Sequence, residues 1–230
     1  MNTKILDRLC TMFKSSPQLL DDNKLLQQAI NGTFGVDIKD IKSTNVTDLT
    51  ELIHYHVLKK YFTTTWQPIT KKYKYSGLSI IDEINNLNPL HVLDLGCGYN
   101  EFKGKMNNLI GVDPYNERAD VNSSILEYKS TQQYDVTICL GSINFGTVDK
   151  IYAELKNAVN LTKPNGLLYF RVNPGEQHMA PEAQWIEFFN WTNEFIINSA
   201  SVLNCSILTL EQEVNDRGVR YYFVLRKNDK

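Results

Sequence analysis

Two acidic residues and two glycines carry the strongest chemical signal in this chain. The apolar run Val92-Leu93-Asp94-Leu95 leads into Gly96-Cys97-Gly98, a loop whose glycines let a ligand approach the backbone closely. Open α/β sheets bind ligands at this edge, beyond the carboxyl ends of their strands. The carboxylate of Asp94 comes with the loop, and it favours a cationic ligand while repelling an anion such as a pyrophosphate.

A second acid follows at the spacing of a ribose-binding residue. Asp113 ends the run Ile110-Gly111-Val112, about nineteen residues after Asp94. An acid at the end of this strand can accept hydrogen bonds from ribose hydroxyls. A dinucleotide-binding loop would carry a third glycine where Glu101 stands. The residues therefore predict a ligand with a ribose, a positively charged group and no pyrophosphate. S-adenosylmethionine has these properties.

Four motifs occur in the order found in the class I S-adenosylmethionine-dependent methyltransferases, and they resemble that family over residues 91–227. They are the glycine motif 94–98, the ribose-binding acid Asp113, the adenine-contacting pair Ser124-Ile125, and the strand motif 134–142, whose end faces the methionine moiety and the substrate in the family. It implies that S-adenosyl-L-methionine is the cofactor. It also implies a set of contact residues that surround the cofactor from its amino acid end to its adenine. These residues are Tyr75, Asp94, Gly96, Cys97, Gly98, Asp113, Pro114, Ser124, Ile125, Leu140, Gly141 and Ser142.

The sequence departs from the family pattern in the first half of the domain. Asn100 stands where many members have a third glycine, and Ser124 stands where an adenine-contacting Asp is common. The connection from Asp113 to Asp120 is also shorter than the dozen or so residues that a helical crossover needs, so we expect a loop there. This compact form is similar to small methyltransferase-like proteins of bacteriophages.

The elements predicted around these motifs give an α/β fold. From residue 91 onwards, short apolar runs alternate with helix-compatible stretches, which is typical of a doubly wound, mostly parallel sheet. The turn Asn215-Asp216-Arg217-Gly218 separates the last two runs and predicts an antiparallel β-hairpin at the end of the sheet. The predicted strands are 92–95, 109–112, 119–121, 136–140, 167–172, 206–214 and 219–227, and the predicted helices are 148–161 and 182–203.

A helical extension is predicted before this domain. Apolar residues recur near helical spacing through residues 5–13, 19–30, 48–62 and 78–84, with a loop around residues 31–44. We therefore expect an N-terminal helical cap over residues 1–76 and a Rossmann-like methyltransferase domain over residues 77–230.

His178 is the candidate catalytic residue. It lies in the loop after the strand predicted at 167–172, at the ligand edge of the sheet, where an imidazole can accept a proton from a hydroxyl or an amine. Asn144, Asn173 and Glu176 are its candidate orienting partners. The alternative interpretation is a solvated loop histidine.

The cysteines and the other histidines indicate neither a metal site nor a disulfide framework. The 4 cysteines have no Cys-x-x-Cys spacing, so we expect reduced thiols. His54 and His56 are two residues apart, whereas paired ligands on a helix are three or four apart. Cys97 and Cys139 are expected to be small buried side chains rather than nucleophiles, because no base or cation nearby would form a thiolate.

Composition and charge describe a folded chain without a strong electrostatic field. The chain has 230 residues, 42% of them hydrophobic and 22% charged, which fits one α/β domain with an extension. Its net charge of -2 is not that of a dedicated nucleic-acid binder. No apolar run approaches the roughly 20 residues that span a bilayer, and charged residues interrupt the first eight positions. We therefore expect a cytoplasmic protein that binds no membrane.

The predicted function is methyl transfer from S-adenosylmethionine to a small molecule or a modest polar acceptor. Three alternatives stay open. A nucleic-acid methyltransferase is favoured by the basic and aromatic residues that alternate from Lys59 to Tyr75, although the Asn-Pro-Pro-Tyr and Pro-Cys motifs of DNA methyltransferases are missing from their positions. A non-catalytic cofactor-binding protein is favoured by Asn100 and by the lack of a clear base. A lyase acting on the same cofactor is the third.

Overall fold

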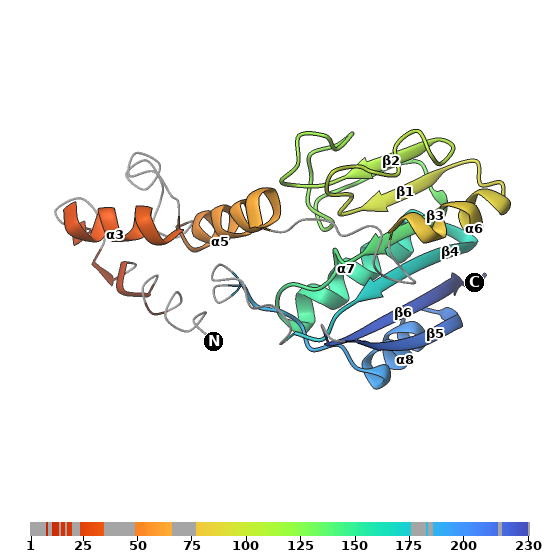
Figure 1. Ribbon diagram of the computed structural model, residues 1–230. Coiled ribbons are helices and arrows are strands. Elements are labelled where there is room, and N and C mark those ends of the chain that lie inside the picture. Colours follow the sequence, from red (N-terminus) through yellow and green to blue (C-terminus); the bar gives the residue numbers. More distant parts are fainter. Residues whose placement is uncertain are drawn as a thin grey trace. The chain divides into compact units, whose positions relative to one another are not determined.

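The computed structural model describes residues 8, 11–13, 15–16, 18–19, 24–34, 49–65, 77–175, 183, 186–215 and 218–229. They belong to two compact units, one within residues 1–67 and 178–187 and the other within residues 68–177 and 188–230 (Figure 1). The boundary between a cap and a domain at residue 76 stays a prediction.

The described part of the first unit is helical, as the apolar spacing predicts. It contains α3 (Lys24–Phe34) and α5 (Leu49–Lys60), and α5 continues into the short π-helical segment η1 (Tyr61–Thr65). The loop predicted around residues 31–44 starts too early, because α3 continues to Phe34, whose side chain is buried. The buried apolar side chains of this unit include Phe13, Ile30, Phe34, Ile53, Val57 and Tyr61.

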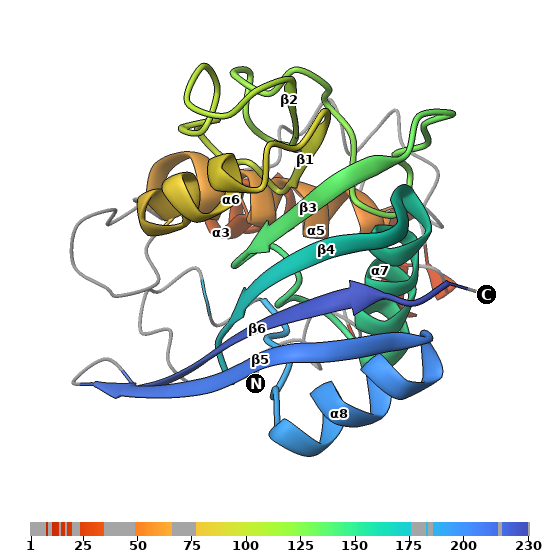
Figure 2. The same cartoon turned by 90° about the vertical axis from the view of Figure 1, so that its right-hand side faces the viewer.

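The second unit is built on a six-stranded sheet with the strand order β2-β1-β3-β4-β6-β5 (Figure 2). Its elements are η2 (Gly77–Ile80), α6 (Ile81–Asn86), β1 (Val92–Leu95), β2 (Leu109–Val112), β3 (Tyr134–Leu140), α7 (Val148–Leu161), β4 (Thr162–Val172), α8 (Asn193–Val202), β5 (Cys205–Asn215) and β6 (Gly218–Lys227). The first four strands are parallel, whereas β6 is antiparallel to both β4 and β5. The predicted α/β fold, a mostly parallel sheet that ends in an antiparallel hairpin, is confirmed.

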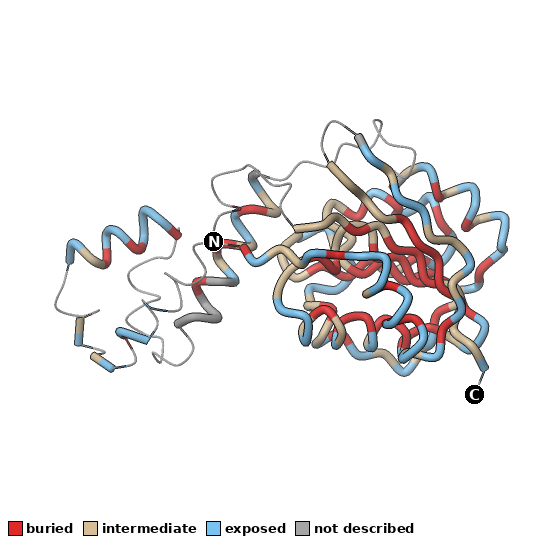
Figure 3. The backbone as a smooth tube through the Cα atoms, turned by 90° about the horizontal axis from the view of Figure 1, so that it is seen from below, coloured by how far each residue is buried: buried red, intermediate tan, exposed pale blue. Residues whose placement is uncertain are grey.

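Helices cover both faces of this sheet. On one face, α7 and α8 contribute Leu155 and Ile196 to a buried cluster that includes Leu93 of β1. On the other face, Ile84 of α6 belongs to a second cluster with Val92 of β1. Buried residues concentrate along the strands between these layers (Figure 3). No helix in the described ranges has both the length and the apolar character needed to cross a membrane.

The strand predicted at residues 119–121 is reduced to a single bridge. Val121 pairs with Val112 as an isolated parallel bridge, and residues 114–120 form turns and bends without a helix. The backbone N–H groups of Asp120 and Val121 both donate to the carbonyl of Gly111, at 2.9 and 3.1 Å. A connection this short keeps the chain beside the end of β2, so it cannot cross the sheet and return as a full strand.

The helix predicted over residues 182–203 begins later than expected. Thr192 caps α8, and residues 186–191 directly before it are not helical. Instead, the backbone N–H of Phe189 donates to the carbonyl of Asn144 at 2.8 Å, and the indole N–H of Trp191 donates to the carbonyl of Ile143 at 3.1 Å. The segment before α8 therefore supports the loop after β3, a tertiary role that helical periodicity does not reveal.

Candidate cofactor-binding site

Asp94 brings a buried carboxylate to the centre of the parallel strands. It lies in β1 between Gly111 of β2 and Ile138 of β3, and only 4% of it is exposed. Burial, and next the charge of Asp113, raise the pKa of Asp94 to about 8. Among the described residues, no lysine or arginine forms an ion pair with it. A ligand cation at this position would favour the charged form of the carboxylate.

Asp113 follows β2 and faces the glycine loop, which we define as residues 96–100. Its Oδ2 accepts a hydrogen bond from the backbone N–H of Gly98 at 3.1 Å. Its Oδ1 accepts two more, from the N–H groups of Tyr115 at 2.8 Å and Asn116 at 2.9 Å. Burial raises the pKa of Asp113, and the three backbone bonds oppose that shift. Because a carboxylate has about four acceptor positions, one on Oδ2 remains for a ligand hydroxyl.

The glycine loop has a backbone that other residues rarely adopt. Gly96 and Gly98 have positive φ angles of 75° and 53°. The N–H groups of Gly96 and Cys97 both donate to the carbonyl of Val112, at 2.7 and 3.1 Å, so the loop is fixed to the end of β2. A Cβ atom at Gly96 would also collide with the side chain of Ser142. Gly96 is therefore required both by its φ angle and by the loop that follows β3.

Three residues predicted to contact the cofactor lie where β3 ends: Leu140 is its last residue, and Gly141 and Ser142 follow. The N–H of Gly141 donates to the carbonyl of Arg171 at 2.8 Å, and its φ angle is 86°. The guanidinium of Arg171 lies 3.7 Å from the position that a Cβ atom of Gly141 would take. Arg171 was not predicted at this site, although a charged residue near the end of an apolar strand is a signal that could have indicated it.

Comparisons with known proteins identify the fold. No protein-family model matches the sequence, and no curated protein matches it. Among solved structures, this chain is similar to the 1,6-didemethyltoxoflavin-N1-methyltransferase of Burkholderia thailandensis, which was solved with bound S-adenosylhomocysteine. The TM-score is 0.56 and the identity 16%, over 76% of this chain and 89% of that chain. The N-methyltransferase NodS of Bradyrhizobium japonicum WM9, bound to the same compound, gives a TM-score of 0.54 and 13% identity, over 76% and 98%. This chain has the fold of class I S-adenosylmethionine-dependent methyltransferases.

A third methyltransferase structure extends the comparison. Magnesium protoporphyrin IX methyltransferase (ChlM) of Synechocystis PCC 6803, with bound S-adenosylmethionine, is similar with a TM-score of 0.54 and 14% identity, over 76% of this chain and 97% of that chain. The methyltransferase fold predicted from the motifs is thereby confirmed. The ligand edge of this fold carries Asp94, the glycine loop and Asp113 in the present chain.

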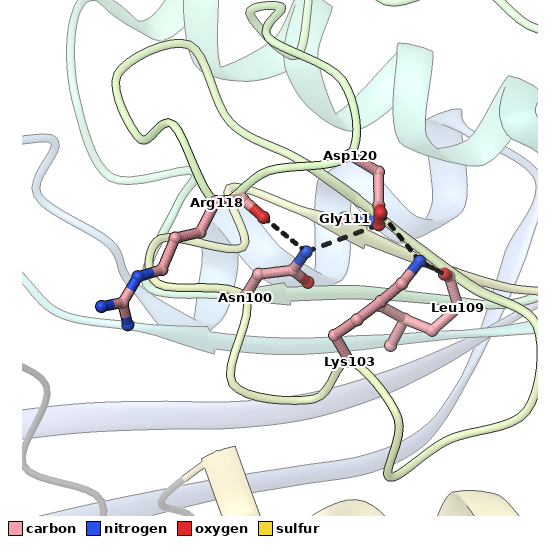
Figure 4. Close-up of polar contacts among 6 residues, drawn as sticks. All are labelled: Asn100, Lys103, Leu109, Gly111, Arg118 and Asp120. Atoms are coloured by element: carbon pink, nitrogen blue, oxygen red, sulfur yellow. Dashed lines mark hydrogen bonds and ion pairs between the residues drawn. The ribbon is translucent and has the colours of Figure 1, made fainter.

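Asn100, the departure from the methyltransferase pattern, has a structural role. Its φ angle is 54°, and its Nδ2 donates to the carbonyl of Arg118 at 2.8 Å and to Oδ2 of Asp120 at 3.4 Å (Figure 4). Asp120 in turn accepts from the N–H of Gly111 at 2.8 Å and pairs with Lys103 at 2.8 Å. We call Asn100, Lys103 and Asp120 the polar clasp. These contacts join the glycine loop to residues 114–120, the loop that takes the place of a full third strand.

The residues predicted to contact adenine are held by their own neighbours. The hydroxyl of Ser124 donates to Oε2 of Glu127 at 2.8 Å and accepts from the Glu127 N–H at 3.2 Å. Ile125 is buried in the main core cluster, and its carbonyl accepts a hydrogen bond from Nδ2 of Asn157 at 2.6 Å. Pro114 is half-buried beside Asp113. The adenine and ribose contacts of these residues stay predictions.

Two predicted site residues, Tyr75 and His178, lie outside the described residues, as does Glu176. Their roles as cofactor contact, base and orienting partner stay predictions. Burial raises the pKa of Cys97 and of Cys139, so both thiols are protonated at neutral pH, which disfavours a nucleophilic role. Within the described ranges, no three His, Cys, Asp or Glu side chains are grouped so that they would hold a metal ion.

Proposed function

We propose that this chain binds S-adenosylmethionine and transfers its methyl group to a small-molecule acceptor. One observation carries the proposal: Asp94, in β1, and Asp113, directly after the adjacent strand β2, are buried carboxylates, and Asp113 accepts a hydrogen bond from the glycine loop that follows β1. The similarity to methyltransferase structures with bound S-adenosylmethionine or S-adenosylhomocysteine supports it.

The chemistry of the described residues fits this cofactor. Asp94 has no cationic partner among them, and its raised pKa means that a bound ammonium or sulfonium would draw it into the charged form. Asp113 keeps one acceptor position for a ribose hydroxyl. When bound, the cofactor supplies a methyl group on a positively charged sulfur. The protein then has to align the acceptor with that methyl group, and no covalent intermediate with the protein is needed.

The end of β3 is the place where this chain would align the acceptor. Gly141 and Ser142 follow the strand directly, and Ser142 packs against Gly96 of the glycine loop. An acceptor above Gly141 would therefore lie next to the loop that receives the cofactor. Arg171, beside Gly141, adds a positive charge to this edge.

Calorimetry and label transfer test the proposal together. We expect S-adenosylmethionine and S-adenosylhomocysteine to bind to the purified chain, and NAD to bind far more weakly. Pools of small metabolites should then take up label from methyl-labelled S-adenosylmethionine. Tight NAD binding without a signal from either sulfur compound would overturn the proposal. Binding without any label transfer would favour the non-catalytic alternative.

A nucleic-acid methyltransferase is the second candidate function. On α5, Lys59 and Lys60 are exposed, and Nζ of Lys59 lies 5.8 Å from the centre of the Tyr55 ring. The rest of the basic and aromatic stretch, residues 66–75, lies outside the described residues. A chain with a net charge of -2 favours small acceptors, so we expect weak oligonucleotide binding that falls steeply with salt. Submicromolar, salt-resistant binding would favour the second candidate.

A further inference from the structure

Two asparagines meet where β3 and β4 end. Asn144 follows β3, and its Nδ2 donates to the carbonyl of Gly141 at 3.1 Å. Its Oδ1 accepts the backbone N–H of Asn173, the first residue after β4, at 3.2 Å. Asn144 is buried, and its own carbonyl accepts from the N–H of Phe189. Asn144 therefore ties the two loops together and sets the position of Asn173.

Oδ1 of Asn173, by contrast, has no hydrogen-bond partner in the described part of the chain. It has less than 1 Å² of accessible surface, although the residue as a whole is only half-buried. A buried acceptor without a donor costs about 1–3 kcal/mol. Such a group in a native structure calls for an explanation, and a donor supplied by a ligand is one.

The loops around this amide contain no base in their described residues. Neither residues 141–147 nor residues 173–175 include a titratable side chain. A hydroxyl acceptor would need a base to remove its proton during attack, whereas a neutral nitrogen attacks with its own lone pair. The guanidinium of Arg171 lies beside Gly141, and its positive charge disfavours an acceptor that is already an ammonium ion.

We propose that Asn173 recognises the methyl acceptor, and that this acceptor is a weakly basic nitrogen that is neutral and carries an N–H. The inference rests on the proposed function. Oδ1 of Asn173 accepts the N–H of the acceptor and orients the nitrogen lone pair. Because positive charge develops on that nitrogen during transfer, the hydrogen bond to the amide oxygen strengthens toward the transition state.

The transfer balances without a further reactant. The nitrogen lone pair forms the new C–N bond, the bond between the methyl carbon and the sulfonium sulfur breaks, and its electron pair stays on the sulfur. The nitrogen then gives up its proton to water. Oδ1 of Asn173 accepts the N–H until that proton leaves, and the amide of Asn173 itself neither gains nor loses a proton.

Two variants separate this role from a structural one. Asn173→Leu removes the acceptor oxygen, whereas Asn173→Asp keeps an acceptor at the same place. Asn160→Leu is the matched control, because Asn160 is exposed at the end of α7, next to the start of β4. We expect all three variants to bind S-adenosylhomocysteine within about threefold of the wild type, since none changes the glycine loop or the acidic residues.

Aniline, phenol and benzylamine are the probes, together with an extract of small metabolites. With methyl-labelled S-adenosylmethionine, we expect the label to appear in N-methyl products. Among the three pure probes, aniline is the one that should be labelled. Transfer should fall by about 100-fold in Asn173→Leu and by less than about tenfold in Asn173→Asp. In the complex with S-adenosylhomocysteine, aniline should also shift the side-chain amide NMR signals of Asn173, which are assigned by their loss in Asn173→Asp.

The outcomes distinguish the two proposals. No binding of S-adenosylhomocysteine to the wild type would overturn the proposed function itself. If that compound binds, three outcomes would overturn the role of Asn173 while leaving the proposed function intact. These are label only in O-methyl products, no label in any nitrogen compound, and undiminished transfer by Asn173→Leu. A shift of the Asn173 amide signals by phenol but not by aniline would do the same.

Discussion

Oδ2 of Asp113 accepts a hydrogen bond from the backbone N–H of Gly98 over 3.1 Å. Asp113 follows β2 and Gly98 follows β1, so this bond joins the two loops that would receive the ribose and the amino acid end of the cofactor. With two further N–H donors on Oδ1, the carboxylate is nearly saturated by its own backbone. Asp113, which we propose binds the ribose, is therefore held in place by the protein's own backbone.

The saturation of Asp113 predicts that it holds a single ribose hydroxyl. Of the 2′-deoxy and 3′-deoxy analogues of S-adenosylhomocysteine, one should lose about tenfold or more in affinity, as expected for a hydrogen bond to a charged group. The other should stay within about threefold. Competition binding measures both, and a large loss of equal size for the two analogues would show that Asp113 contacts both hydroxyls.

Asp94→Asn should make the fold more stable at high pH. The pKa of Asp94 is about 8 in the folded chain and near 3.8 when unfolded, so between these values the folded chain holds a proton that the unfolded chain has lost. The stability contributed by this group therefore falls as the pH rises through that window. We expect the free energy of unfolding of Asp94→Asn to exceed that of the wild type by about 1–3 kcal/mol at pH 8, and by less at pH 5.

Urea denaturation at the two pH values measures this difference. Asp229→Asn, a substitution at an exposed carboxylate near the C-terminus, is the control and should show no such change. If the free energies of unfolding of Asp94→Asn and the wild type differ by the same amount at pH 5 and pH 8, the pKa of Asp94 is not raised in the folded chain. The variant should also lose affinity for the cofactor, because an amide cannot pair with a cation as a carboxylate does.

Asn100 and Gly111 should be coupled in stability. A Cβ atom on Gly111 would collide with Oδ1 of Asn100, so Gly111→Ala should destabilise the fold by about 1–3 kcal/mol. In the Asn100→Gly background the same substitution should cost less, because the amide is gone. A double-mutant cycle by chemical denaturation measures the coupling, and strictly additive effects would argue against the contact.

The strands and the pairing of the two acids were predictable from the sequence because both follow from local pattern. The bounds of β1 and β2 match the apolar runs, and the carboxyl ends of parallel strands meet at one edge, which brings Asp94 and Asp113 together. The single bridge at Val121 and the late start of α8 were not predictable in the same way. Both depend on hydrogen bonds between segments that are distant in the sequence, such as Phe189 with Asn144.

At the site, too, residue identities could be predicted from the sequence, whereas their contacts could not. The sequence identified Asn100 as a departure from the family pattern, but its role depends on the carbonyl of Arg118 and the carboxylate of Asp120, which only the folded loop brings near. Asn144 and Asn173 were named as orienting partners for a histidine. The hydrogen bond from the backbone N–H of Asn173 to Asn144, and the Oδ1 of Asn173 that is unpaired among the described residues, are visible only in three dimensions.

Calorimetric titration of S-adenosylhomocysteine into the wild type and into Asp113→Ala shows whether the chain binds this cofactor product through Asp113. We expect binding to the wild type, a loss of about 1.5–3 kcal/mol in Asp113→Ala for the missing charge-assisted hydrogen bond, and no loss in the exposed control Asp229→Ala. Equal affinity of the wild type and Asp113→Ala, or binding of NAD in place of S-adenosylhomocysteine, would contradict this expectation.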